Sequence, residues 1–215
     1  MSEKQIIISI VGPSTSGKST LSSLLKPLGF SGIVSTTTRP QRTGEQNGID
    51  YHFLSETQFK DMESNGQLVE HAEVGKYLYG VSKQSIYDVA ASGKSAVLVV
   101  EPSGANAVAE FCKEKDILNH KVYLNNPIEL LIQRLQERYE NDKKRDDDVY
   151  KDRLWNIGMI EPKKWTAKAY SGEHYYDQIF DTFNLDNQQD IIDSILSEVN
   201  KKLSNKAVST NKRKF

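Results

Sequence analysis

The sequence predicts an α/β fold in which a parallel β-sheet is flanked by helices. The first observation is a short apolar, mostly β-branched run at 6–11, which a glycine-rich loop joins to helical spacing at 20–28. The second is a pair of further apolar runs, at 95–101 and 122–124, each of which precedes a segment with helical signals. Because strands that alternate with helices are typical of parallel sheets, these observations favour one α/β core.

The length of the chain predicts one domain with insertions, because 215 residues bury one full core but not two large ones. A net charge of -1 gives no electrostatic reason for nucleic acid or membrane as the main partner. The single cysteine, Cys112, excludes an internal disulfide framework and fits a reducing compartment. No apolar run approaches the ~20 residues of a membrane span, and the N-terminus lacks a secretory signal pattern. We therefore expect a cytoplasmic protein, a monomer or homodimer, that binds neither nucleic acid nor membrane.

The loop between the first strand and helix fits the pattern G-x-x-x-x-G-K-[ST] of P-loop proteins, in the strand, loop and helix order that this pattern needs. In that order, backbone N–H groups surround an anion at a helix N-terminus, where the helix dipole also favours negative charge. Lys18 is then expected to reach the β- and γ-phosphates of a nucleoside triphosphate, and Ser19 to place its hydroxyl on Mg²⁺. The predicted triphosphate-binding residues are Gly12, Pro13, Ser14, Thr15, Ser16, Gly17, Lys18, Ser19 and Thr20.

A polar stretch at 35–45 carries Arg39 and Arg42 among hydroxyl side chains, with Pro40 between them. Two arginines at this spacing form a clamp for a phosphate other than the triphosphate, or else the stretch is a solvated loop; the residues alone leave both readings open. After it, residues 67–74 alternate like a strand, which places Leu68, Glu70 and Ala72 on one side.

A dense set of residues follows the loop in a fixed order up to Gly80. These residues are Ser35, Thr37, Thr38, Arg39, Arg42, Gly44, Glu45, Gly48, Asp50, Tyr51, His52, Phe53, Glu70, Tyr79 and Gly80. With this set and the loop, the sequence resembles guanylate kinases, in order from about Ile6 to about Ile195. The resemblance implies a nucleoside monophosphate kinase with a parallel-sheet core, an inserted α+β subdomain that binds the monophosphate, and a helical lid that carries arginines.

The resemblance also implies a role for individual residues. The acceptor phosphate of GMP is expected to bind Ser35, Arg39, Arg42, Tyr51 and Tyr79. A carboxylate suits the guanine edge, because it accepts from both the ring N–H and the amino group, and the resemblance assigns this role to Glu70. The expected catalytic residues are Lys18, Arg39, Arg42, Arg134, Arg138 and Arg153, the last three being lid arginines that act on ATP with Mg²⁺.

The chain departs from the family pattern at the base and metal positions. Val81 stands where most of the family has a serine or threonine that also reads the guanine, and a nearby hydroxyl, that of Ser82, compensates if the chain turns there. Where the family usually has two aspartates, the chain has Val99 and Glu101. We include Val81 and Glu101 in the GMP-binding set, and we assign Glu101 to Mg²⁺ through a water molecule as well. The departures keep a kinase for another deoxynucleotide, or for a ribose bisphosphate, as an alternative.

The expected organisation is a guanylate-kinase-like domain at 1–204 followed by a basic, disordered tail at 205–215. Within the domain, the core comprises 5–34, 83–137 and 154–204, the monophosphate-binding insertion 35–82, and the lid 138–153. A further alternative is a protein-interaction module without activity, but such domains typically lose the phosphate loop, which is intact here.

Overall fold

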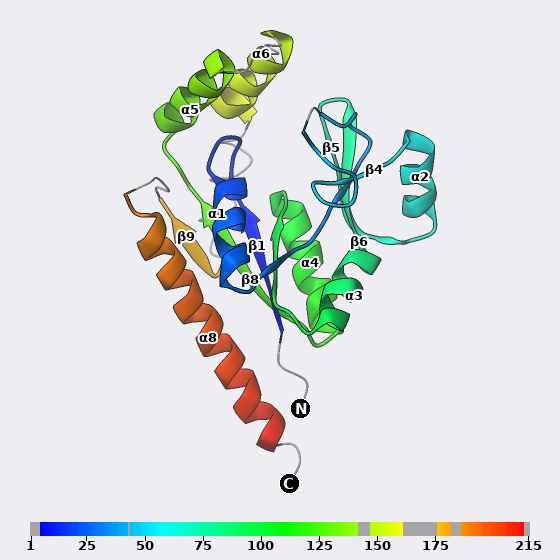
Figure 1. The fold of residues 1–215 in the computed structure, drawn as a ribbon, viewed down its shortest axis with the longest axis vertical. Helices are drawn as coiled ribbons and strands as arrows, with labels where there is room; N and C mark the ends of the chain where they lie inside the picture. Colours follow the sequence, from blue (N-terminus) through cyan, green and yellow to red (C-terminus); the bar gives the residue numbers. More distant parts are fainter. Residues whose placement is uncertain (1–4, 43, 142–146, 161–175, 182–185, 213–215) are drawn as a thin grey trace.

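The described part of the chain forms two β-sheets, and the larger of them forms the core (Figure 1). The structure is a computed structural model that describes residues 5–42, 44–141, 147–160, 176–181 and 186–212. The larger sheet has five strands in the order β2-β7-β1-β8-β9, and every neighbouring pair in it is parallel. Its strands are β1 (Ile6–Val11), β2 (Ser31–Gly32), β7 (Ala96–Val99), β8 (Leu118–Leu124) and β9 (Gln178–Phe180). The predicted fold class, an α/β core with a parallel sheet, is confirmed.

Helices cover both faces of this sheet, and the alternation of β1 shows why. Ile6, Ile8 and Ile10 pack with apolar residues of α1 and α8, whereas Ile7 and Val11 pack with residues of α3 and α4 on the other face. Because both faces of β1 are buried, its sequence is a continuous apolar run instead of an alternating one. The helices are α1 (Lys18–Leu25), α2 (Glu56–Ser64), α3 (Lys83–Ser92), α4 (Pro102–Glu114), α5 (Ile128–Asn141), α6 (Asp147–Trp155) and α8 (Gln188–Lys212), with single helical turns at Lys26–Leu28 and Asn156–Ile160.

The smaller sheet lies entirely within residues 36–82, inside the range expected for the insertion. Its order is β4-β3-β6-β5, where β3 (Thr36–Thr37) pairs in parallel with β4 (His52–Phe53) and antiparallel with β6 (Tyr77–Ser82). Helix α2 begins with a capping box, in which the Ser55 hydroxyl accepts from the Gln58 N–H and the Gln58 side chain accepts from the Ser55 N–H.

The alternation expected for β5 (Leu68–Val74) is wrong at its first residue. A β-bulge separates Leu68, which pairs with Ser82, from Glu70, which pairs with Val81. Since Val81 and Ser82 are neighbours in a strand, they point to opposite sides, and so do Leu68 and Glu70. The bulge therefore turns Glu70 away from the side that Leu68 shares with Gly80. An extra residue in one strand has no signature in an alternating sequence pattern.

The C-terminal helix is longer than expected. The predicted basic tail begins at residue 205, but α8 continues to Lys212, and only residues 213–215 of that tail lie outside the described chain. No glycine or proline interrupts the sequence before that point, so no residue there stops the helix. The Lys206 ammonium also forms an ion pair with Asp116, at 2.8 Å. Among the described residues, no helix is long and apolar enough to cross a membrane.

Helix α3 generates a prediction about Ser82. Its hydroxyl accepts from the Ser85 N–H at 3.0 Å and caps the helix, and its side chain is 6% exposed. Ser82→Ala should therefore lower the free energy of unfolding by about 1 kcal/mol, measured by urea denaturation. The control is Ser103→Ala at an exposed position of α4, which should change it by less than ~0.5 kcal/mol. Equal stabilities of the two variants would contradict the capping role.

Candidate active site

The glycine-rich loop connects β1 to α1 at the carboxyl edge of the parallel sheet. A Cβ atom on Gly12 would lie 2.6 Å from Ser16 Oγ and 2.9 Å from Leu124 O, so only glycine allows this close approach. Gly17 precedes α1 with φ 97°, a conformation that favours glycine. Lys18 Nζ donates to Gly12 O at 2.6 Å and to Pro13 O at 2.7 Å, which folds the lysine back over the loop. The described geometry is that of an anion-binding loop.

Contacts from β8 and α5 hold this loop in place. Asn126, which is 6% exposed, donates from Nδ2 to Ser16 O at 2.8 Å. Thr15 Oγ1 donates to Leu131 O at 2.8 Å, and the Arg134 guanidinium donates to Thr15 O at 3.4 Å. Sequence reasoning missed Asn126. The signal for it was its position just after the buried strand β8, because β8 lies beside β1 and the carboxyl ends of both strands meet at the edge that carries the glycine-rich loop.

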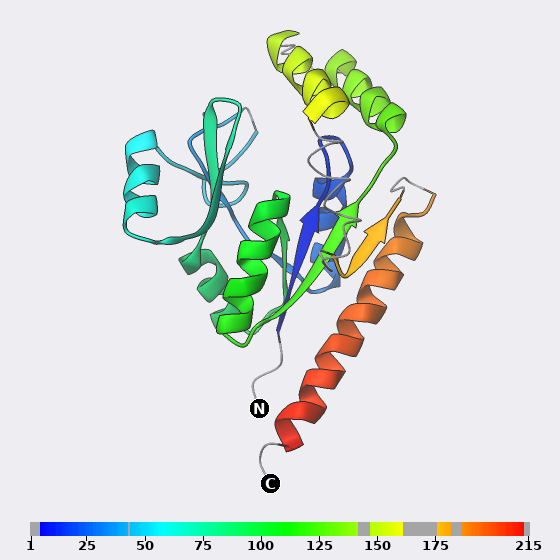
Figure 2. The ribbon, with the colours of Figure 1, turned by 180° about the vertical axis from the view of Figure 1, so that it is seen from behind.

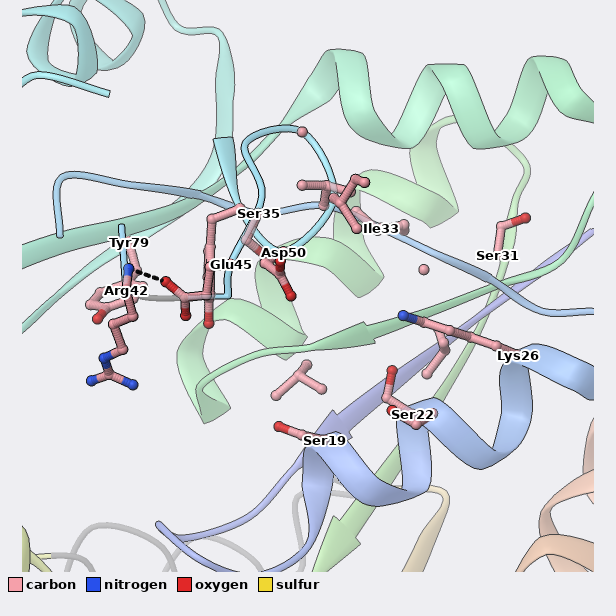
Figure 3. A pocket seen from close by; sticks show the side chains of 18 of the residues that line it. Ser19, Ser22, Lys26, Ser31, Ile33, Ser35, Arg42, Glu45, Asp50 and Tyr79 are labelled. Atoms are coloured by element: carbon pink, nitrogen blue, oxygen red, sulfur yellow. Dashed lines mark hydrogen bonds between the residues drawn. The ribbon is translucent and has the colours of Figure 1, made fainter. Parts of the chain in front are cut away.

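A polar cleft of about 810 Å³ lies between α1 and the insertion. Figure 3 shows Ser19 and Ser22 of α1 and Lys26 of the following turn on one side of it, facing Ser35, Glu45 and Asp50 across the cleft. The predicted residues that line it are Ser19, Ser35, Arg39, Arg42, Tyr51, Tyr79, Arg138 and Arg153. The structure thus brings residues from the loop helix, the insertion and the lid to one cleft of the size that small ligands occupy.

Arg39 is the most buried charged group of this cleft, with 7% of its surface exposed. Its guanidinium donates to Glu45 Oε1 at 2.7 Å and to Pro40 O at 2.8 Å, and it lies 5.5 Å from the ring centre of Tyr51. Burial opposes its charge, but the hydrogen bond and the charge of Glu45 outweigh burial and raise the pKa of Arg39. The second carboxylate oxygen of Glu45 accepts from the Arg42 N–H at 2.8 Å, the contact drawn in Figure 3.

Glu45 therefore orders both arginines, and sequence reasoning gave it no role. It was one of the residues that carry the family resemblance, but its contacts across the turn become visible only when the loop is folded. Of the two readings left open for 35–45, the structure supports the clamp, because a solvated loop would not bury Arg39.

Two of the arginines predicted for the lid, Arg138 and Arg153, lie close to the arginines of the insertion, whereas Arg134 does not line the cleft. Burial, together with the neighbouring charges of Arg138, Arg42 and Arg39, lowers the pKa of Arg153. Four guanidinium groups this close together make the region around Arg153 strongly positive, which favours phosphate oxygens. Aromatic packing of Tyr139 on Tyr150, with ring centres 4.5 Å apart, joins α5 to α6. Residues 142–146 of the predicted lid lie outside the described chain.

The residues predicted at the base, Glu70, Val81 and Glu101, do not line this cleft but lie together beside α4. Glu70 and Val81 are directly opposite each other in the β5–β6 pair, and Val81 is 1% exposed in the apolar core. Burial and the charge of Glu101 raise the pKa of Glu70 to about 7. Among the described residues, the Glu70 carboxyl has no hydrogen-bond partner. Because Ser82 caps α3, its hydroxyl does not compensate for Val81.

The residues present fit a magnesium ion held jointly with a nucleotide. Ser19 is exposed in the first turn of α1 and lines the cleft, which suits a single hydroxyl ligand. No cluster of three or more histidine, cysteine or acidic side chains exists among the residues that the structure describes. Mg²⁺ bound through one protein oxygen and phosphate oxygens needs no such cluster.

The fold and the glycine-rich loop define the chain as a P-loop protein with a second, smaller sheet in its insertion. A family model described as "Guanylate kinase" matches residues 2–204. The chain belongs to the guanylate kinase family. It is 32% identical over 171 residues to a guanylate kinase from Jannaschia sp., covering 77% of this chain and 74% of that one.

Two further relatives extend the comparison. A guanylate kinase from Nitrosococcus oceani is 39% identical over 104 residues, 46% of this chain, so the match spans only 50% of that relative's length. The crystal structure of guanylate kinase from Anaplasma phagocytophilum is similar with a TM-score of 0.61 at 26% identity, covering 91% of this chain and 86% of that one.

The buried carboxyl of Glu70 generates a prediction about stability and pH. The unfolded chain releases this proton near the ordinary pKa of 4.5 and the folded chain near 7, so the folded state binds more protons between these values. The free energy of unfolding should therefore fall as pH rises from 4.5 to 7, by at most about 1.4 kcal/mol per pH unit from this group. Glu70→Gln should remove that fall. Urea denaturation of both proteins across the pH range measures it, and parallel curves would contradict the raised pKa.

Proposed function

We propose that this chain transfers the γ-phosphoryl group of ATP to GMP or dGMP, giving ADP and GDP or dGDP. The observation that carries the proposal is the cleft that Ser19, the insertion's Arg39 and Arg42, and the lid's Arg138 and Arg153 share. A phosphoryl transfer between two nucleotides needs a triphosphate loop, an acceptor-phosphate clamp and lid cations in one place.

The reaction requires little from the protein beyond alignment and charge. An oxygen of the acceptor phosphate, already anionic, attacks the γ-phosphorus; the new P–O bond forms as the bond to the β-phosphate oxygen breaks, and ADP leaves with those electrons. Lys18 and the lid arginines stabilise the charge on the transferred group, and Arg39 and Arg42 orient the acceptor. Mg²⁺, held by Ser19 and the phosphate oxygens, would supply further charge neutralisation, with Glu101 acting through water.

Guanine selection is assigned to Glu70, whose ionised carboxylate accepts from the ring N–H and the amino group of guanine. Each hydrogen bond to a charged group contributes on the order of 1.5–3 kcal/mol, against ~1 kcal/mol for the hydroxyl that Val81 lacks. Guanine preference therefore survives the substitution but is relaxed. The rival proposal is a kinase for another deoxynucleotide or a ribose bisphosphate, and its main support is Val81. It is weaker, because the hydroxyl that Val81 lacks contributes less than the hydrogen bonds of Glu70.

The remaining parts of the proposal concern context. We include in it the division into core, insertion and lid at the boundaries given above. We also include a cytoplasmic location and a monomer or homodimer without nucleic-acid or membrane partners. An interaction module without activity is disfavoured, because the loop lysine and the arginine set are intact.

The experiment that decides among these is a coupled ADP-release assay with ATP, Mg²⁺ and a panel of acceptors: GMP, dGMP, AMP, dTMP and a ribose bisphosphate. GMP or dGMP should have the highest kcat/KM. A higher value for another acceptor would establish the rival kinase, and no turnover with any acceptor would favour the interaction module.

The loop assignment predicts the behaviour of Lys18→Ala. Removing a preorganised charge that acts on the transition state should lower kcat at least ~100-fold. The circular dichroism spectrum should stay unchanged, because the loop lies at the sheet edge and not in the core. Lys113→Ala, at an exposed position of α4 that does not line the cleft, is the matched control and should keep kcat within ~3-fold of wild type. Near-normal turnover of Lys18→Ala would contradict the assignment.

The base assignment predicts a pH dependence of GMP binding. Because guanine needs the ionised form of Glu70, and burial raises the pKa of this group to about 7, the KM for GMP should rise below pH 7, approaching tenfold per pH unit. The second ionisation of the phosphate, with a pKa of about 6, contributes equally in Glu70→Gln, which serves as the control. The ratio of the two proteins' KM values isolates Glu70, and a ratio independent of pH would contradict its role.

A further inference from the structure

We propose that Gly104 is a specificity-determining position, because its missing side chain leaves the space in which the Glu70 carboxyl is held. This inference rests on the proposed function, in which Glu70 reads the guanine. Gly104 lies within α4, far from Glu70 in the sequence, and the first turn of that helix is at the end nearest the insertion (Figure 2).

The contact between the two residues is closer than any side chain at position 104 allows. A Cβ atom built on Gly104 would lie 2.6 Å from Glu70 Oε2, 2.8 Å from its Cδ and 3.1 Å from its Cγ. All three nearest atoms belong to this one side chain. The carboxyl of Glu70 therefore rests directly on the backbone of α4, which packs against β5.

The backbone of Glu70 is fixed by two further features of the hairpin. The bulge between Leu68 and Glu70 turns the Glu70 side chain toward the side that carries Val81 and Tyr79. On the opposite side, a Cβ atom on Gly80 would lie 2.9 Å from Glu70 O and 3.1 Å from Phe59 Cζ, so glycine is needed there for the strands to approach. The close approach at Gly80 thus fixes the backbone position of Glu70, and the space at Gly104 fixes the position of its carboxyl.

The helix itself gives no reason for a glycine at position 104. Gly104 does not have a positive φ, and glycine destabilises a helix interior relative to alanine. An alanine there would suit α4 and conflict only with the far end of the Glu70 side chain, which can swing away. Glycine at this position therefore lowers the stability of α4 but leaves the space in which the Glu70 carboxyl lies.

The test compares Gly104→Ala with wild type in steady-state kinetics, with each substrate varied while the other is saturating. Gly104→Ala should raise the KM for GMP at least ~10-fold, because the displaced carboxylate no longer meets both guanine donors. The KM for ATP and the kcat/KM for AMP, which lacks this donor pair, should stay within ~3-fold. The melting temperature should be unchanged or higher, which excludes general destabilisation. Ser103→Ala, at the adjacent exposed position, should match wild type in every measurement.

A double-mutant cycle shows whether Gly104 acts through Glu70. Glu70→Ala alone should raise the KM for GMP, and adding Gly104→Ala to it should cost no more than ~2-fold further, because the group in conflict is gone. The inference is overturned if Gly104→Ala keeps the wild-type KM, or if its effect persists undiminished in the Glu70→Ala background. If Glu70→Ala itself leaves GMP preference intact, the base assignment in the proposed function fails, and the inference fails with it.

Discussion

A buried positive charge is the constraint on which the structure of the insertion depends. Arg39 is almost fully excluded from solvent, and an unpaired guanidinium in that position would be strongly destabilising. Glu45 neutralises it, and the ring centres of Tyr51 and Phe53 lie 5.5 and 5.6 Å from it, within the range of cation–π contacts. The same carboxylate also binds the Arg42 backbone, so one ion pair orders the loop, both arginines and Tyr51. The arrangement of the two arginines and the fold of this loop therefore depend on the same contacts.

The fold could be predicted from the sequence because its signals are local. The apolar run of β1, the capping box at Ser55 and the glycine that ends α3 at Gly93 each fix an element through neighbours only a few residues away. The errors occurred where the deciding contact was not local. The bulge before Glu70 depends on the facing strand, and the end of α8 depends on what stops a helix, which residues 205–212 do not contain.

The residues of the candidate site also divide into those with a local sequence signal and those without one. Its loop is a contiguous motif, so its residues can be named from the amino-acid sequence alone. The contacts of Asn126 and Glu45 cannot be read from the sequence in this way. Asn126 binds Ser16 O, more than a hundred residues away, and Glu45 binds Arg39 and the Arg42 N–H only when the loop turns back on itself. Gly104 is the extreme case. Sequence reasoning treats glycine as a sign of a turn or a positive φ, whereas here glycine is needed because another residue's side chain occupies the place of its Cβ.

Burial and the charge of Glu101 raise the pKa of Glu70, and no nearby group among the described residues offsets them by donating to its carboxyl. The residue opposite Glu70 carries no hydroxyl, and the carboxyl lies among a valine, a glycine backbone and another acid, none of which donates to it in the described chain. A carboxylate so placed is costly until a ligand supplies donors. Under the proposed function, guanine supplies two and adenine supplies no such pair. Most of the family pattern uses both a carboxylate and a hydroxyl to recognise guanine. Under the proposed function, recognition in this chain depends on Glu70 alone, and the cost of leaving its carboxylate unpaired becomes the source of selectivity.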